Sequence, residues 1–478
     1  MRFQGLSYLA LSSLLLTIAL AAPTQNQNQK HRETNPICII GGGAAGLTTA
    51  SLLHEKGYRT VVFEKQPKVG GKCRTLQVGG HKIDMGALLL DNSYTHVLAL
   101  IKKFGMHTAT VLDGKGAVTA YDYNTGALVN LPYFNETTAT PEIRAAIAKF
   151  KAELKKYPEM DNGSAGHRLR RPELYVPFAK WLVDRGMGAL LELFVVPIEH
   201  EGYGSLSETP AMYVLNFLNT KTAGSLVFSE TNVDTIVEGW NALKENMARA
   251  LPDVRTGMHI VGIRRPAGDD HHGHQVSVVY YDVHNYKHIQ KCQSVVIAFP
   301  QLLERLEFLG LDARERNLFR NVQHTTYFSA AFSAPGLPIK NGEELLQLVN
   351  GNKTQVNSIG EGEPMSILAQ SPEVYTSYAW FRDQRVEQNN HKLSKIVEKK
   401  LIGFVDRATK GKIKAKVIEV DQWDYFPHVG TKALLNGFYQ KAEKIQGYRR
   451  TYYTGSLFGF ETVERTMDAA HDLVKNHF

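Results

Sequence analysis

The chain has 478 residues, its formal net charge is +8, and 43% of its residues are hydrophobic. This charge is modest for the length, and the basic clusters are short and scattered, so nucleic acid is not expected as a partner. Because one hydrophobic core cannot accommodate so long a chain, the length predicts two domains.

The chain begins with a predicted secretory signal peptide over residues 1–21. Arg2 supplies the positive start, residues 9–20 are the apolar core, and a small-x-small cleavage site ends at Ala21. Residues 22–34 are predicted to be a disordered leader. No later run reaches the ~20 apolar residues that a membrane span needs. We therefore expect a soluble protein that is secreted, and retention in an internal compartment of the secretory pathway stays open.

The sequons are compatible with the secretory pathway, whereas the cysteines predict no disulfide framework. Three N-x-[ST] sequons predict glycosylation at Asn135, Asn162 and Asn352. The chain has three cysteines, and Cys38 lies within the first predicted strand. We interpret Cys38 as a small buried hydrophobic residue, and no disulfide framework is predicted.

The organising stretch is residues 37–64, which reads ICIIGGGAAGLTTASLLHEKGYRTVVFE. The apolar run 37–40 predicts a buried parallel strand, residues 44–56 predict a helix that ends at Gly57, and residues 60–63 predict a second strand. A G-x-G-x-x-G turn joins the first strand to the helix. The stretch therefore has the pattern of the βαβ unit in dinucleotide-binding domains.

Each residue of this turn has a physical task. Gly41 permits the tight turn, Gly43 lets the backbone approach a pyrophosphate, and Gly46 lets helix and strand pack closely. Ala45 lies in the first turn of the helix, whose N-terminus attracts the anion. Glu64 follows the second strand, where its carboxylate can accept hydrogen bonds from a ribose. An acid at this position indicates an adenosine without a 2′-phosphate, and thus FAD or NAD.

Two further turns of small residues follow, GGKCRT at 70–75 and DMGA at 84–87. With the βαβ unit and its acid, they resemble the FAD-binding half of the flavin amine oxidase superfamily, which includes monoamine and polyamine oxidases, protoporphyrinogen oxidase and phytoene-type desaturases. The resemblance implies FAD as the cofactor. It places Gly71, Arg74 and Thr75 along the pyrophosphate and ribityl chain, and Gly86 and Ala87 at the isoalloxazine. The residue types agree, because a guanidinium pairs with phosphate oxygens and small residues admit a flat ring.

The middle of the chain returns to the cofactor domain with one helix and three strands, predicted over 239–251, 259–263, 275–281 and 294–299. In the superfamily, the first hydrophobic residue of the strand after this helix packs near the adenine, which implies that role for Ile260. The histidine-rich stretch 269–274 stands where a hairpin turn belongs, and no metal site is predicted.

The C-terminal part predicts a strand over 450–454 and a helix over 462–476, joined by a glycine-rich turn. A strand that leads through glycines into a helix N-terminus builds an anion site, and the superfamily closes its flavin pocket here. Candidates for contacts with the cofactor are therefore Gly455, Ser456, Phe460 and Thr462. Ser456 stands where an acid is usual in the superfamily, so its contact must differ.

The expected fold class is α/β, with a Rossmann-type FAD-binding domain interleaved with an α+β substrate domain, as in amine oxidases. The FAD-binding domain is predicted from 35–95, 236–324 and 425–478, and the substrate domain from 96–235 and 325–424. Helical patterns cover 141–157 and 176–194. The substrate domain is dense in aromatic residues, namely Tyr203, Tyr213, Phe217, Tyr327, Phe328, Tyr378, Trp380, Trp423, Tyr425 and Phe426. Such residues are more often core than pocket.

Longer phrases point to one branch. PFAKWLVDRGM, HEGYGSLSETPAMYVL, QWDYFPHV and QGYRRTYYTGSLFGFETVE resemble secreted fungal oxidoreductases of the β-cyclopiazonate dehydrogenase type, and more distantly flavin-dependent fatty-acid double-bond isomerases. The resemblance implies dehydrogenation or oxidative cyclisation of a small hydrophobic molecule in fungal secondary metabolism, with O2 or another electron acceptor.

Two departures from the superfamily bear on the chemistry. No cysteine follows Cys292, so the cysteine linkage to flavin of monoamine oxidases is excluded, and the stretch 323–328 lacks the lysine that many amine oxidases place there. A secreted amine or amino-acid oxidase that releases hydrogen peroxide, a flavin isomerase, and a cofactor-binding protein without turnover stay open as alternatives. His324 and Tyr327 are hypotheses for a catalytic base, and no catalytic residue is assigned.

Overall fold

The computed structural model describes residues 35–112, 118–122, 127–129, 139–161, 165–228, 232–267, 275–339, 344–348, 360–382 and 391–478. The predicted signal peptide and leader, the glycosylation sites Asn135, Asn162 and Asn352, and the histidine-rich stretch 269–274 lie outside these residues. Residues from Asn35 to Phe478 form one compact unit.

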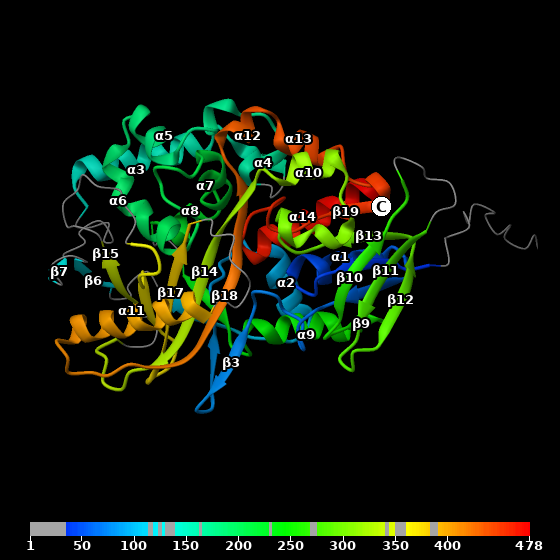
Figure 1. Ribbon diagram of the computed structural model, residues 1–478. Coiled ribbons are helices and arrows are strands. Elements are labelled where there is room, and N and C mark those ends of the chain that lie inside the picture. Colours follow the sequence, from blue (N-terminus) through cyan, green and yellow to red (C-terminus); the bar gives the residue numbers. More distant parts are fainter. Residues whose placement is uncertain are drawn as a thin grey trace, which may run out of the picture. The chain divides into compact units, whose positions relative to one another are not determined.

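A five-stranded parallel sheet lies in the half of the unit that contains the C-terminus (Figure 1). Its strand order is β19 (Thr451–Tyr453), β13 (Ser294–Ile297), β1 (Ile37–Ile40), β2 (Thr60–Phe63) and β9 (Val254–Arg255). Ile37 pairs with Ser294 on one side and with Thr60 on the other. Because parallel strands end at the same edge, three distant stretches of chain meet beyond Ile40, Ile297 and Tyr453. The expected Rossmann-type α/β architecture is confirmed, and the domain boundaries stay a prediction.

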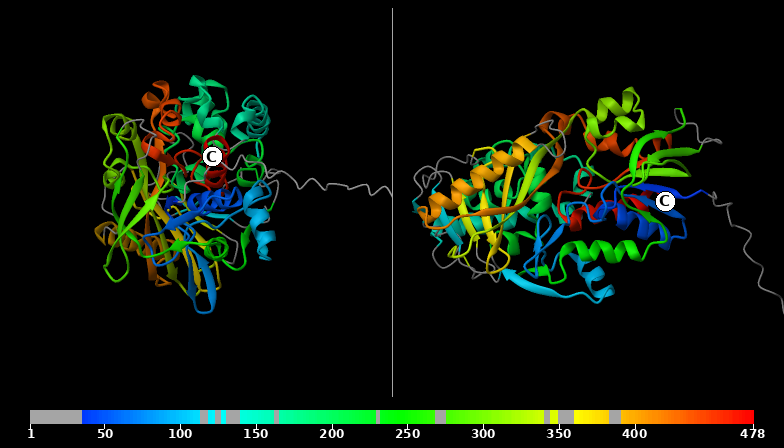
Figure 2. Two further views of the ribbon diagram at one scale, coloured as in Figure 1. Left: turned by 90° about the vertical axis from the view of Figure 1, so that its right-hand side faces the viewer. Right: turned by 60° about the horizontal axis from the view of Figure 1, so that its bottom comes forward.

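Four helices surround this sheet, namely α1 (Ala44–Glu55), α2 (Thr95–Lys103), α9 (Trp240–Arg249) and α14 (Val463–His477). Ala50 and Leu53 of α1 share one hydrophobic cluster with Leu473 and Val474 of α14. The first and last helices of the unit therefore lie side by side (Figure 2). β1, α1 and β2 have the predicted positions to within one residue.

The second large sheet has seven strands in the order β18 (Lys416–Val429), β14 (Val322–Ser333), β17 (Val374–Phe381), β16 (Ser366–Ala369), β15 (Glu344–Leu348), β6 (Val118–Asp122) and β7 (Leu128–Val129). Its described pairs are antiparallel except for β15 with β6. Helix α11 (His391–Thr409) packs on one face, where Phe328 and Phe332 lie with Val397 and Phe404. The opposite face therefore remains for the residues that alternate with them, such as Tyr327.

A helical layer accompanies the seven-stranded sheet. Its helices are α3 (Pro141–Leu154), α4 (Ala165–Arg168), α5 (Phe178–Asp184), α6 (Leu191–Phe194), α7 (Ala211–Phe217) and α8 (Ala223–Leu226). The continuous helix predicted over 176–194 is wrong, because Gly186 takes the left-handed conformation after α5. Helix α6 then continues as a π-helix over Val195–His200, where Pro197 has no N–H to donate.

Small sheets and helices complete the unit. A three-stranded antiparallel sheet contains β10 (His259–Arg264), β11 (Val276–Tyr281) and β12 (Lys287–Cys292), of which β12 had no counterpart among the predicted strands. Two further antiparallel pairs are the hairpin of β3 (Thr75–Val78) with β4 (His81–Asp84), and β5 (Thr108–Leu112) with the distant β8 (Val233–Ile236). The remaining helices are α10 (Ala313–Phe319), α12 (Thr431–Leu435) and α13 (Phe438–Glu443).

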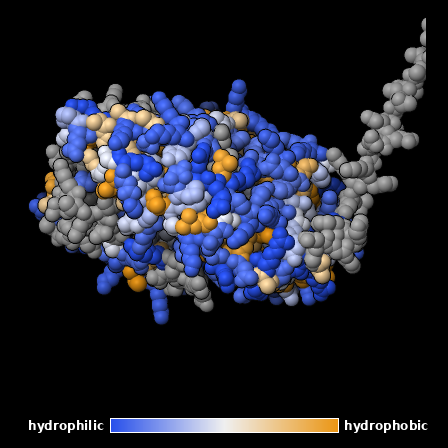
Figure 3. Space-filling model, turned by 90° about the horizontal axis from the view of Figure 1, so that it is seen from above, coloured by the Kyte–Doolittle hydropathy of each residue, from blue (hydrophilic) through white to orange (hydrophobic). Residues whose placement is uncertain are grey.

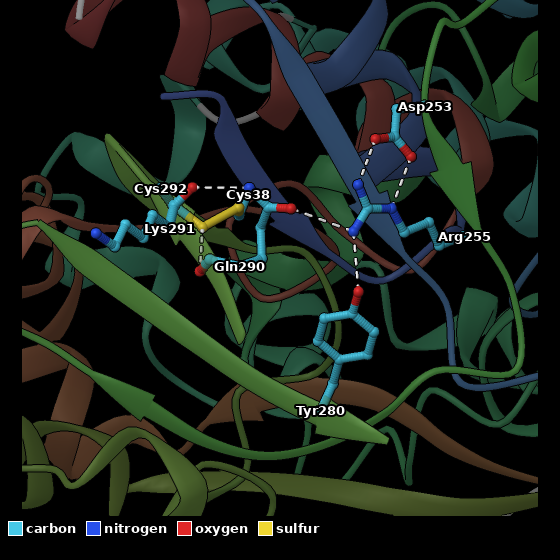
Figure 4. The surroundings of a disulfide bond; sticks show 7 residues. All are labelled: Cys38, Asp253, Arg255, Tyr280, Gln290, Lys291 and Cys292. Atoms are coloured by element: carbon cyan, nitrogen blue, oxygen red, sulfur yellow. Dashed lines mark hydrogen bonds and ion pairs between the residues drawn. A yellow bond between two sulfur atoms is a disulfide. The ribbon is translucent and has the colours of Figure 1, made fainter. Parts of the chain in front are cut away.

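A disulfide between Cys38 and Cys292 joins β1 to the end of β12, with the two Cα atoms 5.8 Å apart (Figure 4). The interpretation of Cys38 as an unpaired hydrophobic residue is therefore wrong. Ile37 pairs with Ser294, so the end of β12, two residues before Ser294, lies near the start of β1, although 254 residues separate the two cysteines. Nearby, Arg255 binds both carboxylate oxygens of Asp253 and the hydroxyl of Tyr280.

The face that carries α5, α12 and α13 is mostly hydrophilic, with separate small apolar patches (Figure 3). Within the part of the chain that the structure describes, no helix is both long and apolar enough to cross a membrane.

The disulfide predicts the thiol count of the unfolded protein. In denaturant without a reductant, a thiol reagent should titrate one group, Cys73, and after reduction it should titrate all three cysteines. Three thiols without reduction would contradict the disulfide. Replacing Cys38 and Cys292 together by alanine should lower the free energy of unfolding in urea by about 2–4 kcal/mol, because the unfolded chain gains freedom.

Candidate cofactor and substrate site

The loop between β1 and α1 packs so tightly on the first turn of α1 that only glycine fits at one position in each. A Cβ atom on Gly46 would lie 1.8 Å from the carbonyl oxygen of Gly41. Gly41 itself has φ +113°, and a Cβ there would lie 3.0 Å from the carbonyl oxygen of Ala298 at the end of β13. The first N–H groups of α1, including that of Ala45, have no partner within the helix. This N-terminus therefore suits an anion.

Glu64 is held beneath this loop by backbone groups. Its side-chain oxygens accept hydrogen bonds from the N–H of Gly42 and the N–H of Gln66, both at 2.7 Å, and the residue is only 6% exposed. Its own carbonyl oxygen accepts from the N–H of Met258, two residues before Ile260 on β10. The structure thus brings Glu64 and the strand of Ile260 together, and their contacts to ribose and adenine stay predictions.

The second glycine turn packs directly on the first. The N–H of Gly70 donates to the carbonyl oxygen of Gly42 at 2.9 Å, and a Cβ on Gly71 would lie 3.2 Å from the Cα of Gly43. The third turn packs in turn on the second, because a Cβ on Gly86 would lie 1.7 Å from the carbonyl oxygen of Lys72. The N–H of Ala87 donates to that same oxygen at 3.1 Å.

Thr75 has a structural task in this arrangement. Its hydroxyl donates to Asp84 at 2.5 Å and accepts from the N–H of Asn241, while the N–H of Trp240 donates to Asp84. Thr75 and Asp84 therefore cap the N-terminus of α9. Burial raises the pKa of Asp84 to about 6, although the bonds from Thr75 and Trp240 oppose the shift.

Arg74 leaves the glycine turn toward the seven-stranded sheet. Its guanidinium forms ion pairs with Asp421 and Glu419 of β18. Sequence reasoning did not anticipate these partners, because β18 follows almost 350 residues later in the chain. The predicted contact of Arg74 with the pyrophosphate or ribityl chain stays a prediction.

The C-terminal turn closes the same region. A Cβ on Gly455 would lie 3.9 Å from the Cβ of Ala45, and Ser456 is half-buried in the next position. The hydroxyl of Thr462 accepts from the N–H of Arg465 and caps α14. Phe460 is buried, with its ring stacked on that of Phe217 at 5.2 Å. The segments that carry the predicted cofactor residues therefore converge around the N-terminus of α1.

One lysine and one glutamate tie these turns together, and sequence reasoning missed both. Lys72 donates to Glu461 at 2.5 Å, and the other carboxylate oxygen of Glu461 accepts from the N–H of Phe426 at 2.7 Å. The ammonium of Lys72 also lies 5.2 Å from the ring centre of Tyr425. A charged residue inside the glycine-rich turn was the signal that could have revealed this pair.

Aromatic side chains cover the face of the seven-stranded sheet opposite α11, and we call this surface the aromatic face. It comprises Tyr327, Tyr378, Trp380, Trp423 and Tyr425. The rings of Tyr327 and Tyr425 are stacked at 4.4 Å, and the hydroxyl of Tyr425 donates to that of Tyr203 at 3.2 Å. Phe328, another of the aromatic residues of the substrate domain, lies in the core on the α11 side, in line with the expectation that such residues are more often core than pocket.

Three buried polar atoms on the aromatic face have no hydrogen-bond partner among the described residues. They are Ser329 Oγ, Trp423 Nε1 and Asp421 Oδ2. Ser329 pairs in register with Asp421, and Tyr327 pairs with Trp423, so all of them project from the same face. Burial raises the pKa of Asp421 to about 6, against the opposing charge of Arg74. Because unpaired buried polar groups are costly, these atoms suit the polar groups of a bound molecule.

The π-helix contributes a second pair of buried polar residues beside the aromatic face. Glu199 is 0% exposed, and its carbonyl oxygen accepts from Trp380 Nε1 at 2.7 Å. One carboxylate oxygen accepts from the N–H of Leu206 at 2.9 Å, and the other has no partner among the described residues. The neighbouring His200 is 2% exposed, with neither ring nitrogen bonded. Burial raises the pKa of Glu199 to about 7 and lowers that of His200 to about 3.

The two hypotheses for a base have different surroundings. His324 is buried on β14, with its Nε2 atom 3.8 Å from a carboxylate oxygen of Asp424. Asp424 is also paired with Arg305. Tyr327 lies on the aromatic face, so of the two it is the one placed beside the buried polar atoms described above.

Among the described residues, one group combines potential metal ligands, namely His96, Glu464 and Asp468. The carboxylate of Glu464 accepts from the N–H groups of His96 and Val97, and Asp468 is paired with Arg465. These groups cap α2 and neutralise one another, which explains their proximity without a metal.

Together, the glycine turns at the carboxyl edge of a parallel sheet and the facing aromatic surface define an oxidoreductase of the dinucleotide-dependent class. Residues 44–303 match the model of the family "Flavin containing amine oxidoreductase". The chain belongs to this family of flavin-dependent enzymes.

Individual relatives are distant but cover nearly the whole chain. An FAD-dependent oxidoreductase of Apiospora sacchari is 25% identical over 94% of this chain and 94% of its own length. Beta-cyclopiazonate dehydrogenase of Aspergillus oryzae is 22% identical over 96% and 94%. The crystal structure of a CLA-producing fatty acid isomerase from P. acnes superimposes with a TM-score of 0.77 at 23% identity, over 93% of this chain and 99% of that one. This likeness confirms the amine oxidase-like fold.

The packing around Gly46 predicts a severe effect of a single methyl group. Gly46→Ala should lower the free energy of unfolding by about 1–3 kcal/mol, because the new Cβ must displace α1 from the β1–α1 loop. Flavin content after purification should fall as well. Gly262→Ala is the matched control, since a Cβ there meets nothing within 4 Å. Equal stability of the two variants in thermal and urea unfolding would refute this account of the loop.

Because Glu199 is buried, we predict that replacing it by glutamine stabilises the protein by an amount that depends on pH. The folded-state pKa of about 7 exceeds the ordinary value of 4.5, so the wild type loses stability as the pH rises through this window. Glu199→Gln should be close to neutral at pH 5 and more stable than the wild type at pH 8, by up to about 3 kcal/mol. Urea unfolding of both proteins at the two pH values measures this difference. If the difference in free energy of unfolding between the two proteins is the same at both pH values, burial does not raise the pKa of Glu199.

Proposed function

We propose that the protein binds FAD and oxidises a small hydrophobic molecule by dehydrogenation or oxidative cyclisation, in fungal secondary metabolism. The observation that carries the proposal is the aromatic face, with its unpaired buried polar atoms, packed against the glycine turns through Lys72 and Arg74. Such a surface suits a largely apolar substrate that presents a few polar groups.

FAD fits the residues that are present. A Cβ on Gly71 would lie 3.2 Å from the Cα of Gly43, so a side chain on Gly71 would crowd the N-terminus of α1. The N-terminus of α1 supplies N–H groups for a diphosphate, and the carboxylate of Glu64 lies at the adjoining strand end for a ribose. The other contacts to FAD that the sequence predicts, at residues such as Arg74, Ile260 and Thr462, are part of this proposal.

The cofactor would supply hydride acceptance and subsequent reoxidation by O2 or another acceptor. The protein itself orients and desolvates the substrate. Tyr327, Tyr425 and Trp423 offer flat apolar surfaces, while Ser329 and Asp421 offer hydrogen bonds that fix the substrate's orientation. Asp421 is also suited to exchange a proton at slightly acidic pH, because burial raises its pKa to about 6.

Oxidation of simple amines is less well supported. Strand β14 contains no lysine between Val322 and Ser333, and the described part of the aromatic face presents phenols and indoles. The similarity to β-cyclopiazonate dehydrogenase supports dehydrogenation. An amine or amino-acid oxidase and a double-bond isomerase remain outcomes that the experiment below separates.

We also propose that the protein is secreted and glycosylated at the three sequons. The disulfide between Cys38 and Cys292 supports this route, because such bonds form and persist in oxidising compartments.

The test is anaerobic reduction of the purified flavoprotein, followed by its visible absorbance. A prenylated indole alkaloid or a terpenoid should bleach the flavin band and give a product two hydrogens lighter, whereas benzylamine and putrescine should leave the band unchanged. Bleaching by the amines alone would contradict the proposal and favour an amine oxidase. Conversion of an unsaturated fatty acid without any oxidant, to a product of equal mass, would identify an isomerase. Absence of FAD, even after reconstitution, would refute the proposal altogether.

A further inference from the structure

Helix α9 carries a lysine on the face that it buries. Its buried residues are Trp240, Leu243, Lys244 and Met247, a spacing that forms one stripe along the helix. Three of the four pack into hydrophobic clusters, Trp240 and Leu243 beside Cys73, and Met247 beside Leu47. Lys244 is the single charged member of this stripe and is 0% exposed.

The ammonium group of Lys244 has no hydrogen-bond partner within the described part of the chain. The groups that act on its charge are Cys73, which is a buried free thiol, and Glu464. The carboxylate of Glu464 is already used by the N–H groups of His96 and Val97 and by the hydroxyl of Thr95. Burial lowers the pKa of Lys244, as expected for an ammonium without a dedicated counter-ion.

The surroundings of this lysine are the parts of the fold that suit a phosphate. Ala44, the first residue of α1, and Val463, the first residue of α14, pack against the cluster of Trp240, Leu243 and Cys73. A Cβ on Gly70 would lie 2.3 Å from the side-chain oxygen of Asn241, so α9 also lies directly against the second glycine turn (Figure 1). Cys73, one of the groups that act on the charge of Lys244, belongs to this same turn.

Two helix N-termini and a buried ammonium thus share one region, in which the carboxylate of Glu464 is already bonded to the N–H groups of α2. Each helix N-terminus carries partial positive charge, and a buried cation needs a counter-charge or strong hydrogen bonds. We propose that Lys244 is a buried phosphate-binding residue, whose ammonium pairs with the diphosphate of the bound dinucleotide from beneath the glycine turns. The inference rests on the proposed function, because FAD is the dinucleotide that it requires.

The test compares Lys244→Met with the wild type as apoproteins, using FAD, riboflavin and ADP as probes. Methionine keeps an unbranched side chain of nearly the same length and removes its charge. The variant should bind FAD and ADP about 10- to 100-fold more weakly, which is the effect of one lost hydrogen bond to a charged group. Riboflavin carries no phosphate, so its affinity should be unchanged. Quenching of flavin fluorescence measures both flavins, and a thermal shift measures ADP.

Stability separates this role from a structural one. Because the variant removes an unpaired buried charge, the melting temperature of the Lys244→Met apoprotein should equal or exceed that of the wild type. Lys244→Arg should recover part of the FAD affinity, and Lys102→Met, at an exposed site on α2, should bind all three probes normally.

Two results would overturn the inference. One is unchanged binding of FAD and ADP by Lys244→Met, and the other is an equal loss of FAD and riboflavin affinity with a lower melting temperature. Both results require a wild type that binds FAD. A wild type that binds neither FAD nor ADP would instead refute the proposed function.

Discussion

The close approach of two glycine turns is the constraint on which the rest of the structure depends. Only 3.2 Å would separate a Cβ on Gly71 from the Cα of Gly43, and Gly71 has φ +59°, so a side chain on Gly71 would press the second turn away from the β1–α1 loop. The second turn carries Lys72 and Arg74, which reach Glu461 and β18. The contact between Gly43 and Gly71, together with these ion pairs, therefore helps to position the five-stranded parallel sheet relative to the aromatic face.

The core of the parallel sheet is apolar, whereas several buried polar atoms lie near the glycine turns and the aromatic face. Strands β1, β2 and β13 are buried along their whole length, and the disulfide from Cys38 to Cys292 connects this sheet to the antiparallel strands. Unpaired buried polar atoms are found at Ser329, at Glu199 and at Lys244. Such atoms oppose folding, so these three suit contacts with bound molecules beside the glycine turns and the aromatic face. Other unpaired buried polar atoms lie elsewhere among the described residues, for example at Trp181 and Thr235.

The sequence was sufficient for the features that depend on neighbouring residues. The strands and helix of the first βαβ unit follow from an apolar run, the spacing of Gly41, Gly43 and Gly46, and the acid at Glu64. The C-terminal strand and helix follow from the same kind of local signal. The strand-to-helix geometry of a glycine turn is encoded within a few residues, so no tertiary information is needed.

Features that depend on packing could not be predicted in the same way. The disulfide needed the register of β1 against β13, and the ion pairs of Arg74 needed the position of β18. Lys244 lay in a predicted helix, but only the packing of α9 shows that its ammonium is buried without a partner. Glu199 gains its raised pKa from burial in a π-helix, a conformation that no local pattern indicated.

The most direct test of the central claim is a crystal structure of the protein purified with its native chromophore. The account predicts FAD with its diphosphate at the N-terminus of α1 beside Gly43 and Gly71, its ribose at Glu64, and its flavin ring between Gly86 and the aromatic face. A chromophore bound elsewhere, or a ring with no contact to the aromatic face, would contradict the account.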